Sequence, residues 1–202
     1  PVRHALLQLW ADAFAHVSLA EMDDVHLAPG AAPAPREAIW RVYRYKTARY
    51  TFCLPLATGL IMAGAPPALR RRVHTYGDQL GLLFQLKDDE LGLFGSARQT
   101  GKPVGSDIAQ NKKTLYHHYL LTGTRGATQR RLRAIFGAAR VNARDVAAVR
   151  AAVEQQGIRA ALEHTAHTLA ARARRSAARM PVADALRAQL LQLVDYSMAR
   201  TR

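Results

Sequence analysis

The sequence predicts an all-α fold, and three observations support this class. Ala, Leu and Arg dominate its 202 residues and runs of β-branched residues are scarce, which favours helix over strand. Apolar residues recur at helical spacing, and clusters of proline and glycine separate most of the periodic segments. Because 49% of the residues are apolar and the length suits one core, we expect residues 1–202 to form a single all-helical domain.

The first half of the chain divides into three expected helices. Residues 2–27 form an amphipathic pattern that HLAPGAAPAP ends, because three prolines and a glycine cannot continue a helix. A second helix is expected over residues 35–64, with a kink at Pro55. The sequence GAPP at residues 64–67 ends this helix, and a third helix is expected over residues 68–94.

The second half begins with an expected loop over residues 95–111, which glycine and proline punctuate. A short helix over residues 114–121 stops at Thr122-Gly123. Four more helices are expected near residues 126–138, 142–156, 158–179 and 182–200, and Asn142, Asp145 and Pro181 are suitable start signals.

Composition indicates which kinds of partner and which cellular compartment suit this chain. Basic residues exceed acidic ones by 29 − 15 = 14, which indicates an anionic partner: nucleic acid, a membrane surface or a phosphorylated small molecule. The arginines between Arg125 and Arg179 are spread over Ala-rich helices and do not cluster with aromatics, so we expect no nucleic-acid binding. No apolar stretch reaches a membrane span. The single cysteine, Cys53, fits a reducing, cytoplasmic compartment and is expected to be a small buried hydrophobe rather than a catalytic thiol.

Gln85, Asp88, Asp89 and Gly92 are spaced i, i+3, i+4 and i+7, so they share one face of the third helix. Neighbouring carboxylates repel unless a cation neutralises them, and the many leucines around them indicate burial, which is costly for an unpaired acid. Oxygen ligands without Cys or His favour magnesium.

The following loop adds cations and a further carboxylate. Mg²⁺ is usually held by one or two carboxylates together with phosphate oxygens, and the loop supplies Lys102, Lys112 and Asp107. Its glycines and Asn111 would let the backbone approach a ligand closely. Either feature alone is typical of a solvated surface. Their conjunction within 27 residues, from Gln85 to Asn111, favours a diphosphate–magnesium site.

This stretch resembles the second aspartate-rich region of trans-isoprenyl diphosphate synthases, the polyprenyl synthetase family. Members show Phe-Gln, then DDxxD, then GKxxGxD, then GK or NK followed by Thr. Here the matching residues are Phe84-Gln85, Asp88-Asp89, Lys102, Asp107 and Lys112, and Gly92 replaces the third Asp. YKTARYTF resembles the Lys-Thr motif with Lys46 and Thr47. AEMDDV falls at the family's Gly-Gln-x-x-Asp pattern, where Asp24 matches and Ala20 and Glu21 depart from it.

The resemblance covers essentially the whole chain and implies an isoprenoid synthase-type helical bundle that lacks its N-terminal helices. The family's first DDxxD motif does not occur, and Pro1 lies inside a helical pattern. We therefore expect the C-terminal two thirds of a synthase, whose N-terminal helices are disordered, cleaved, omitted or on a separate subunit. A degenerate, non-catalytic partner is a third explanation.

The resemblance also implies the chemistry. Mg²⁺ would assist ionisation of an allylic prenyl diphosphate, which isopentenyl diphosphate then attacks; the expected assembly is a homodimer and the expected product geranylgeranyl diphosphate. Asp88 would ligate Mg²⁺ directly, with Asp89 and Asp107 as ligands or acceptors for its waters. The remaining assignments are diphosphate binding by Lys46, Lys102 and Lys112, polar groups near the cation from Thr47 and Gln85, and substrate binding by Asp24. Two alternatives are a regulatory subunit of a hetero-oligomeric synthase and a class I terpene cyclase, which the GKPVGSD…NKKT loop argues against.

Overall fold

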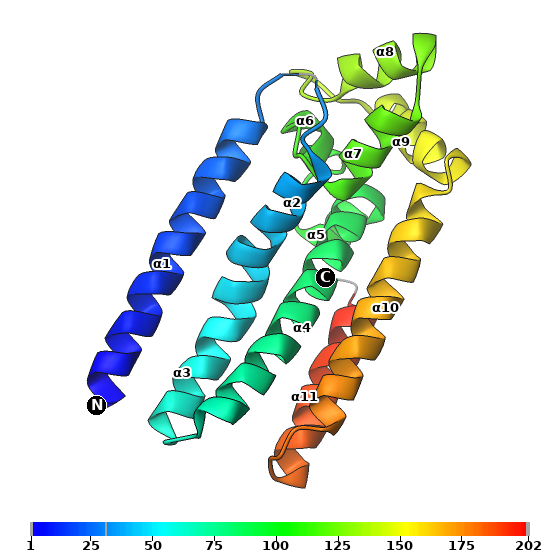
Figure 1. The fold of residues 1–202 in the computed structure, drawn as a ribbon. Helices are drawn as coiled ribbons and strands as arrows, with labels where there is room; N and C mark the ends of the chain where they lie inside the picture. Colours follow the sequence, from blue (N-terminus) through cyan, green and yellow to red (C-terminus); the bar gives the residue numbers. More distant parts are fainter. Residues whose placement is uncertain (1, 31, 201–202) are drawn as a thin grey trace. The chain divides into compact units, whose positions relative to one another are not determined.

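The computed structural model describes residues 2–30 and 32–200, and within these ranges it contains helices and connecting segments but no strand (Figure 1). The all-α prediction is confirmed. The helices are α1 (Val2–Leu27), α2 (Arg36–Val42), η1 (Tyr43–Cys53), α3 (Leu54–Met62), α4 (Pro67–Phe94), α5 (Ala97–Thr100), α6 (Ser106–Ala109), α7 (Leu115–Gly123), α8 (Gly126–Ile135), α9 (Ala143–Gln155), α10 (Ile158–Ala178) and α11 (Asp184–Ala199). None of the described helices is both long and apolar enough to cross a membrane.

The expected helix over residues 35–64 is in fact three consecutive segments, because η1 is π-helical. The backbone N–H of Leu54, at the end of this segment, donates to Arg49 O, five residues back rather than four. Pro55 follows at once in the first turn of α3, where its missing N–H is tolerated. Apolar spacing cannot distinguish the two bonding patterns, so the sequence did not reveal the π-helical segment.

The expected loop over residues 95–111 contains two short helices, α5 and α6. The start of α5 carries a capping box: the side chain of Ser96 accepts from the backbone N–H of Gln99, and the side chain of Gln99 accepts from the backbone N–H of Ser96. This Ser-x-x-Gln signal was present in the sequence. Two glycines with positive φ bound these helices: Gly101, with a φ of 68°, ends α5, and Gly105, with a φ of 85°, precedes α6.

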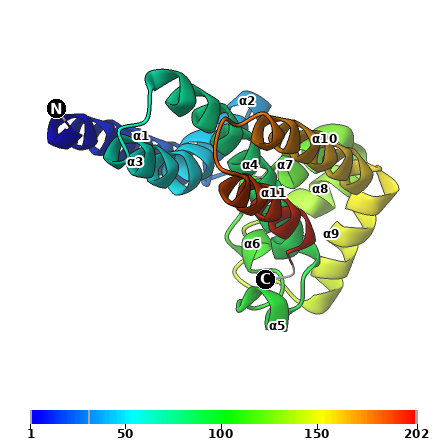
Figure 2. The ribbon, with the colours of Figure 1, turned by 90° about the horizontal axis from the view of Figure 1, so that it is seen from below.

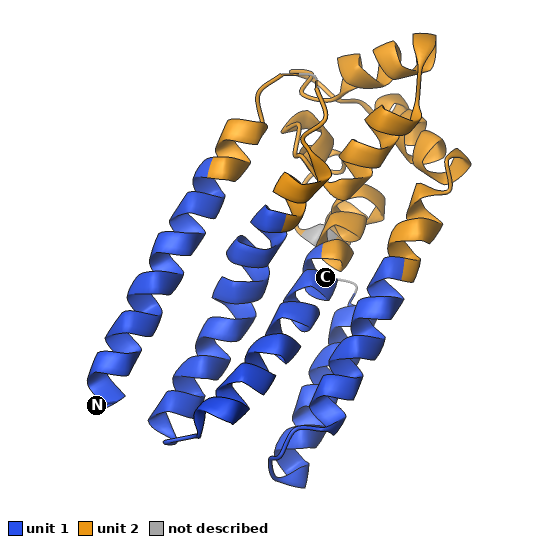
Figure 3. Ribbon diagram, in the orientation of Figure 1, with its two compact units in different colours: residues 1–22, 41–85, 165–200 blue, residues 23–40, 86–164, 201–202 orange. Residues whose placement is uncertain are grey.

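Tertiary contacts divide the chain into two compact units (Figure 3). Unit 1 comprises residues 1–22, 41–85 and 165–200, and its described part consists of long helices lying side by side. In the view from below, α11 lies beside α10, and Arg174 donates to Asp195 across this pair at 2.7 Å (Figure 2). The buried Tyr76 of α4 donates to Leu190 O of α11 at 2.7 Å.

Unit 2 comprises residues 23–40, 86–164 and 201–202, and its described helices are shorter. Arg150 of α9 donates to the carbonyls of Leu93 and Gly95, and so gives hydrogen-bond partners to carbonyl groups at the end of α4 that have none within the helix. The N–H of Gly137 donates to Ile108 O at 2.9 Å and ties the end of α8 to α6. These contacts join α9 to the C-terminal end of α4 and the end of α8 to α6.

Candidate functional site

Three carboxylates gather around one ammonium group in unit 2. The Nζ atom of Lys112 lies 3.1 Å from Asp89 Oδ1, 3.8 Å from Asp107 Oδ2 and 3.9 Å from Asp88 Oδ2. The nearby carboxylates, Asp89 above all, raise the pKa of Lys112 beyond its usual range, so this lysine is charged. The sequence predicted that these four residues would share a site, and the structure brings them together. We call them the carboxylate cluster.

The two adjacent aspartates of α4 differ in exposure. Asp89 is only 2% exposed, whereas the side chain of Asp88 is 45% exposed. A buried carboxylate is tolerated only when a cation or hydrogen bonds compensate for its lost hydration, and the ammonium of Lys112 supplies that charge. Asp88 is therefore the more accessible of the two to an incoming ligand.

The turn after α6 positions Lys112. The backbone N–H of Lys112 donates to Asp107 O at 3.0 Å, so the chain folds back on itself. Asn111, the residue before, has a φ of 52°, a left-handed conformation that asparagine tolerates better than most residues. Its amide donates to Ala28 O and Gly30 O, both at 2.9 Å, which pins the turn to the segment after α1.

Gly92 explains how Asp107 reaches the cluster. A Cβ atom built on Gly92 would lie 2.1 Å from Asp107 Oδ2 and 3.0 Å from its Cγ. The carboxylate of Asp107 thus occupies the space that any side chain at position 92 would need. Asp107 therefore stands against the position of α4 that Gly92 leaves without a side chain.

A small cavity of about 20 Å³ adjoins the cluster within unit 2. It has room for a water molecule. Asp89, Asp107 and Lys112 line it together with apolar side chains and His117. His117 is 1% exposed, packs against Phe136 at 4.6 Å between ring centroids, and has no hydrogen-bond partner on either ring nitrogen within the described chain. It is a core histidine.

The predicted residues of unit 1 form two polar pairs. Thr47 Oγ1 donates to Gln85 Oε1 at 2.6 Å, which orients the Gln85 amide. Lys46 Nζ donates to Glu21 Oε2 at 2.9 Å. The sequence proposed Lys46, Thr47 and Gln85 for the site but did not foresee Glu21 as the partner of Lys46. The available signal was the departure of Glu21 from the Gly-Gln-x-x-Asp pattern that AEMDDV resembles.

The two remaining predicted residues belong to unit 2. Lys102 is exposed in the turn between α5 and α6, and Asp24 is half-buried in the last turn of α1. Sequence reasoning also missed Lys113, which is 5% exposed and donates to Gly30 O at 2.9 Å. It gives the turn after α6 a third attachment to the segment after α1.

Comparisons with known proteins identify the family of this chain. The family model described as polyprenyl synthetase matches residues 2–155. The geranylfarnesyl diphosphate synthase of Aeropyrum pernix is 30% identical over 145 residues, which are 71% of this chain and 44% of the relative. The (2E,6E)-farnesyl diphosphate synthase of Mycobacterium tuberculosis is 51% identical over 57 residues, 28% of this chain and 16% of the relative.

A solved structure shows the same fold. The geranylgeranyl pyrophosphate synthase from Corynebacterium glutamicum, complexed with isoprenyl diphosphate and magnesium, has a TM-score of 0.91 and 29% identity. The match covers 98% of this chain and 56% of that one, so this chain spans little more than half the length of its neighbour. The predicted isoprenoid synthase-type helical bundle is confirmed. Together with the match over residues 2–155, this places the chain in the polyprenyl synthetase family.

Proposed function

We propose that this chain carries the second metal-binding half of a Mg²⁺-dependent trans-prenyltransferase. That enzyme joins isopentenyl diphosphate to an allylic prenyl diphosphate and releases a product one isoprene unit longer. The observation that carries the proposal is the convergence of Asp88, Asp89 and Asp107 around Lys112. On an ordinary solvated acidic face, Asp89 would be exposed and no further acid from a loop would lie beside it.

The donor set of the carboxylate cluster fits magnesium. All three acids offer hard oxygen atoms, and the half-exposed Asp88 leaves room for the waters and phosphate oxygens that Mg²⁺ retains. When bound, the ion supplies Lewis-acid stabilisation of a departing diphosphate. A relative of the same fold was crystallised with magnesium and isoprenyl diphosphate, which supports this choice of ion.

The proposed roles follow from the charges and contacts. Lys112 offsets one of the three negative charges of the acids in the free protein and pairs with a diphosphate oxygen in the complex. Lys46 and Lys102 contribute further positive charge for diphosphate, and the Thr47–Gln85 pair presents an oriented dipole. Asp24 takes part in substrate binding.

No protein nucleophile is needed. The C–O bond of the allylic diphosphate breaks, the double bond of isopentenyl diphosphate attacks C1 of the resulting cation, and the released diphosphate accepts the proton. Catalysis of this kind depends on electrostatic stabilisation of the leaving group, which Lys112 and a metal ion held by the three acids would supply.

The proposal is tested by transfer of radiolabelled isopentenyl diphosphate as a function of Mg²⁺ concentration. In the complete enzyme, Asp88→Ala should abolish Mg²⁺-dependent transfer while circular dichroism shows an unchanged helical fold. Asp12→Ala, at an exposed position of α1, is the matched control and should retain activity. Full Mg²⁺-dependent transfer by Asp88→Ala would refute the assignment.

Lys112→Ala tests the diphosphate role. It should weaken binding of inorganic pyrophosphate and raise the KM for the allylic substrate. Because the variant also leaves Asp89 buried without its cation, unfolding must be measured alongside binding. An unchanged KM in a folded variant would argue against a phosphate contact by Lys112.

A second candidate role is a subunit of a two-component synthase. The heptaprenyl diphosphate synthase component 2 of Geobacillus stearothermophilus is 38% identical over 88 residues, 42% of this chain and 28% of the relative. Two results would favour the single-component enzyme. The purified protein would show transfer activity without any partner, and light scattering would give the mass of a homodimer. Chromatography of its products tests the proposed geranylgeranyl length.

A further inference from the structure

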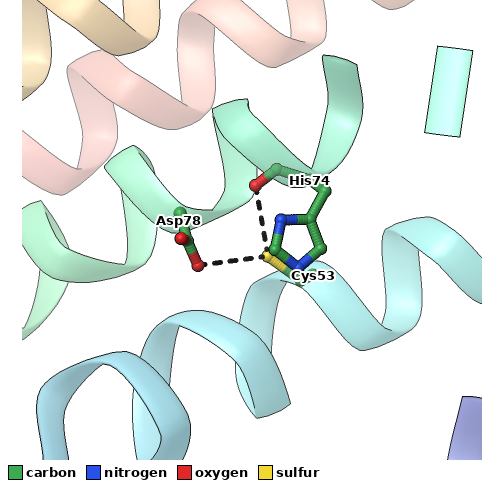
Figure 4. Close-up of side chains that lie close together, drawn as sticks. All are labelled: Cys53, His74 and Asp78. Carbon is green, nitrogen blue, oxygen red and sulfur yellow. Dashed lines mark hydrogen bonds between the residues drawn. The ribbon is translucent and has the colours of Figure 1, made fainter. Parts of the chain in front are cut away.

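A second group of potential metal ligands lies in unit 1, on residues to which the proposed prenyltransferase assigns no role. Cys53 at the end of η1 faces His74 and Asp78 of α4, and the three side chains point toward one another (Figure 4). Each offers one ligand atom, and these atoms all lie within 4.8 Å of one another. His74 and Asp78 are spaced i, i+4, so they share one face of α4.

The close approach of η1 to α4 puts the sulfur between the other two ligands. A Cβ atom built on Gly77, which lies between His74 and Asp78 in sequence, would be 2.7 Å from Cys53 Sγ. The thiol packs directly over this glycine, 3.5 Å from His74 O and 3.9 Å from Asp78 Oδ1. The π-helical backbone of η1 ends at Cys53, and such segments are frequent at functional sites.

We propose that Cys53, His74 and Asp78 bind a Zn²⁺ ion. Thiolate, imidazole and carboxylate are the three ligand types that zinc takes in proteins, and three protein ligands leave one position for water. Magnesium and calcium prefer oxygen ligands and would not select a thiolate with an imidazole. The donor atoms therefore separate this site from the all-oxygen carboxylate cluster.

Binding at this site requires a change of protonation at Cys53. Burial raises the pKa of the Cys53 thiol to about 12, so the free protein holds it protonated. Binding forms a Zn–S bond, breaks the S–H bond and releases the proton to solvent. Burial lowers the pKa of His74, which keeps its imidazole neutral with a lone pair for the metal. The thiolate formed on binding supplies one full negative charge toward the two positive charges of the ion.

Two arginines orient the third ligand. Arg49 Nε donates to Asp78 Oδ1 at 3.2 Å, and Arg44 Nε lies 3.7 Å from Oδ2. A carboxylate offers about four lone-pair sites, so each oxygen can still accept a metal bond. Because the guanidinium groups already offset part of the Asp78 charge, the thiolate supplies most of the attraction. Side-chain rotations must bring the ligand atoms inward, since zinc bonds are about 2.0–2.3 Å long.

A bound ion would link η1 to α4 within unit 1. Lys46 and Thr47 belong to the same π-helical segment as Cys53, so the ion would stiffen the segment that presents them. The expected consequence is a higher unfolding temperature in the presence of zinc, because a ligand that binds only the folded state stabilises it.

Cobalt substitution tests the site on the intact protein, in excess Mg²⁺ so that the carboxylate cluster is occupied. Co²⁺ bound to a thiolate gives a sulfur-to-metal charge-transfer band in the near ultraviolet, and Cys53 is the only cysteine. The wild type should develop this band with one equivalent of Co²⁺, lose it on addition of Zn²⁺, and unfold at a higher temperature with either ion.

Variants identify the ligands. Cys53→Ser should lose the band, and His74→Gln and Asp78→Asn should each weaken Co²⁺ binding by about tenfold or more. Should Cys53→Ser fail to fold, the other two variants carry the test. His167→Gln, an exposed histidine of α10, and Asp88→Asn should leave the band unchanged. No band at one equivalent in the wild type, or a band that His74→Gln leaves intact, would overturn the proposal.

Discussion

Replacing Gly92 by alanine tests how the carboxylate cluster is assembled. The new Cβ would lie 2.1 Å from Asp107 Oδ2, whereas real Cβ atoms essentially never approach another atom within 3.0 Å. The carboxylate must therefore retreat by at least 3.0 − 2.1 = 0.9 Å. It ends a short side chain on α6, so it can move without disturbing the backbone of α4.

The expected effect is large on metal binding and small on stability. Metal–ligand distances hold to within about 0.2 Å, so a shift of this size removes Asp107 from a shared metal site. Loss of a group that supports a metal site typically lowers affinity by about 10–100-fold. The free energy of unfolding should change by less than about 1 kcal/mol, because alanine favours a helix over glycine by about that amount and offsets the displacement.

Isothermal titration of Mg²⁺ in the presence of pyrophosphate measures the affinity, and urea unfolding measures the stability. Gly59→Ala is the matched control: Gly59 is an exposed helical glycine of α3 with no atom within 4 Å of a built Cβ. Its Mg²⁺ affinity should equal that of the wild type. Equal Mg²⁺ affinity in Gly92→Ala and wild type would show that Asp107 does not contribute to a metal site.

Three further predictions concern stability. Gly81→Ala should destabilise the protein by about 1–3 kcal/mol, because its Cβ would meet Ala48 Cα at 2.3 Å. Gly59→Ala should instead stabilise the protein by about 0.5–1 kcal/mol. Thermal melts that rank the two variants in the opposite order would contradict the packing argument. Asn142→Ala removes the side chain that caps α9 and should cost about 1 kcal/mol in urea unfolding, an effect that Asn142→Asp should largely avoid. Burial lowers the pKa of His117 from 6.5 to about 3, so below pH 6.5 the unfolded chain takes up a proton that the folded chain does not. The wild type should therefore lose about 2 kcal/mol by about pH 5. His117→Leu should remove this loss but not the contribution of His74, whose pKa burial also lowers, and equal slopes in urea titrations would show that His117 is not buried as a neutral group.

Part of this structure follows from local pattern alone. The all-α class, the break after residue 27 and the helix over residues 67–94 depend on composition, periodicity and prolines, which act within a few residues. The shared face of Asp88 and Asp89 follows from helical geometry, since positions i+3 and i+4 from Gln85 must lie close together. The resemblance to prenyl diphosphate synthases followed from the same local motifs.

Other features required the tertiary structure, because they depend on contacts between segments far apart in the chain. Periodicity could not say that Asp89 is buried while Asp88 is half-exposed, since exposure is set by what packs on α4. Nor could it place the carboxylate of Asp107 in the space left by Gly92, which depends on the turn that closes after α6. The sequence determined which acids and lysines were available and which of them shared a helix face. Packing of α4 against its neighbours decided which charges met, because an acid is buried only where a fold brings a cation to it.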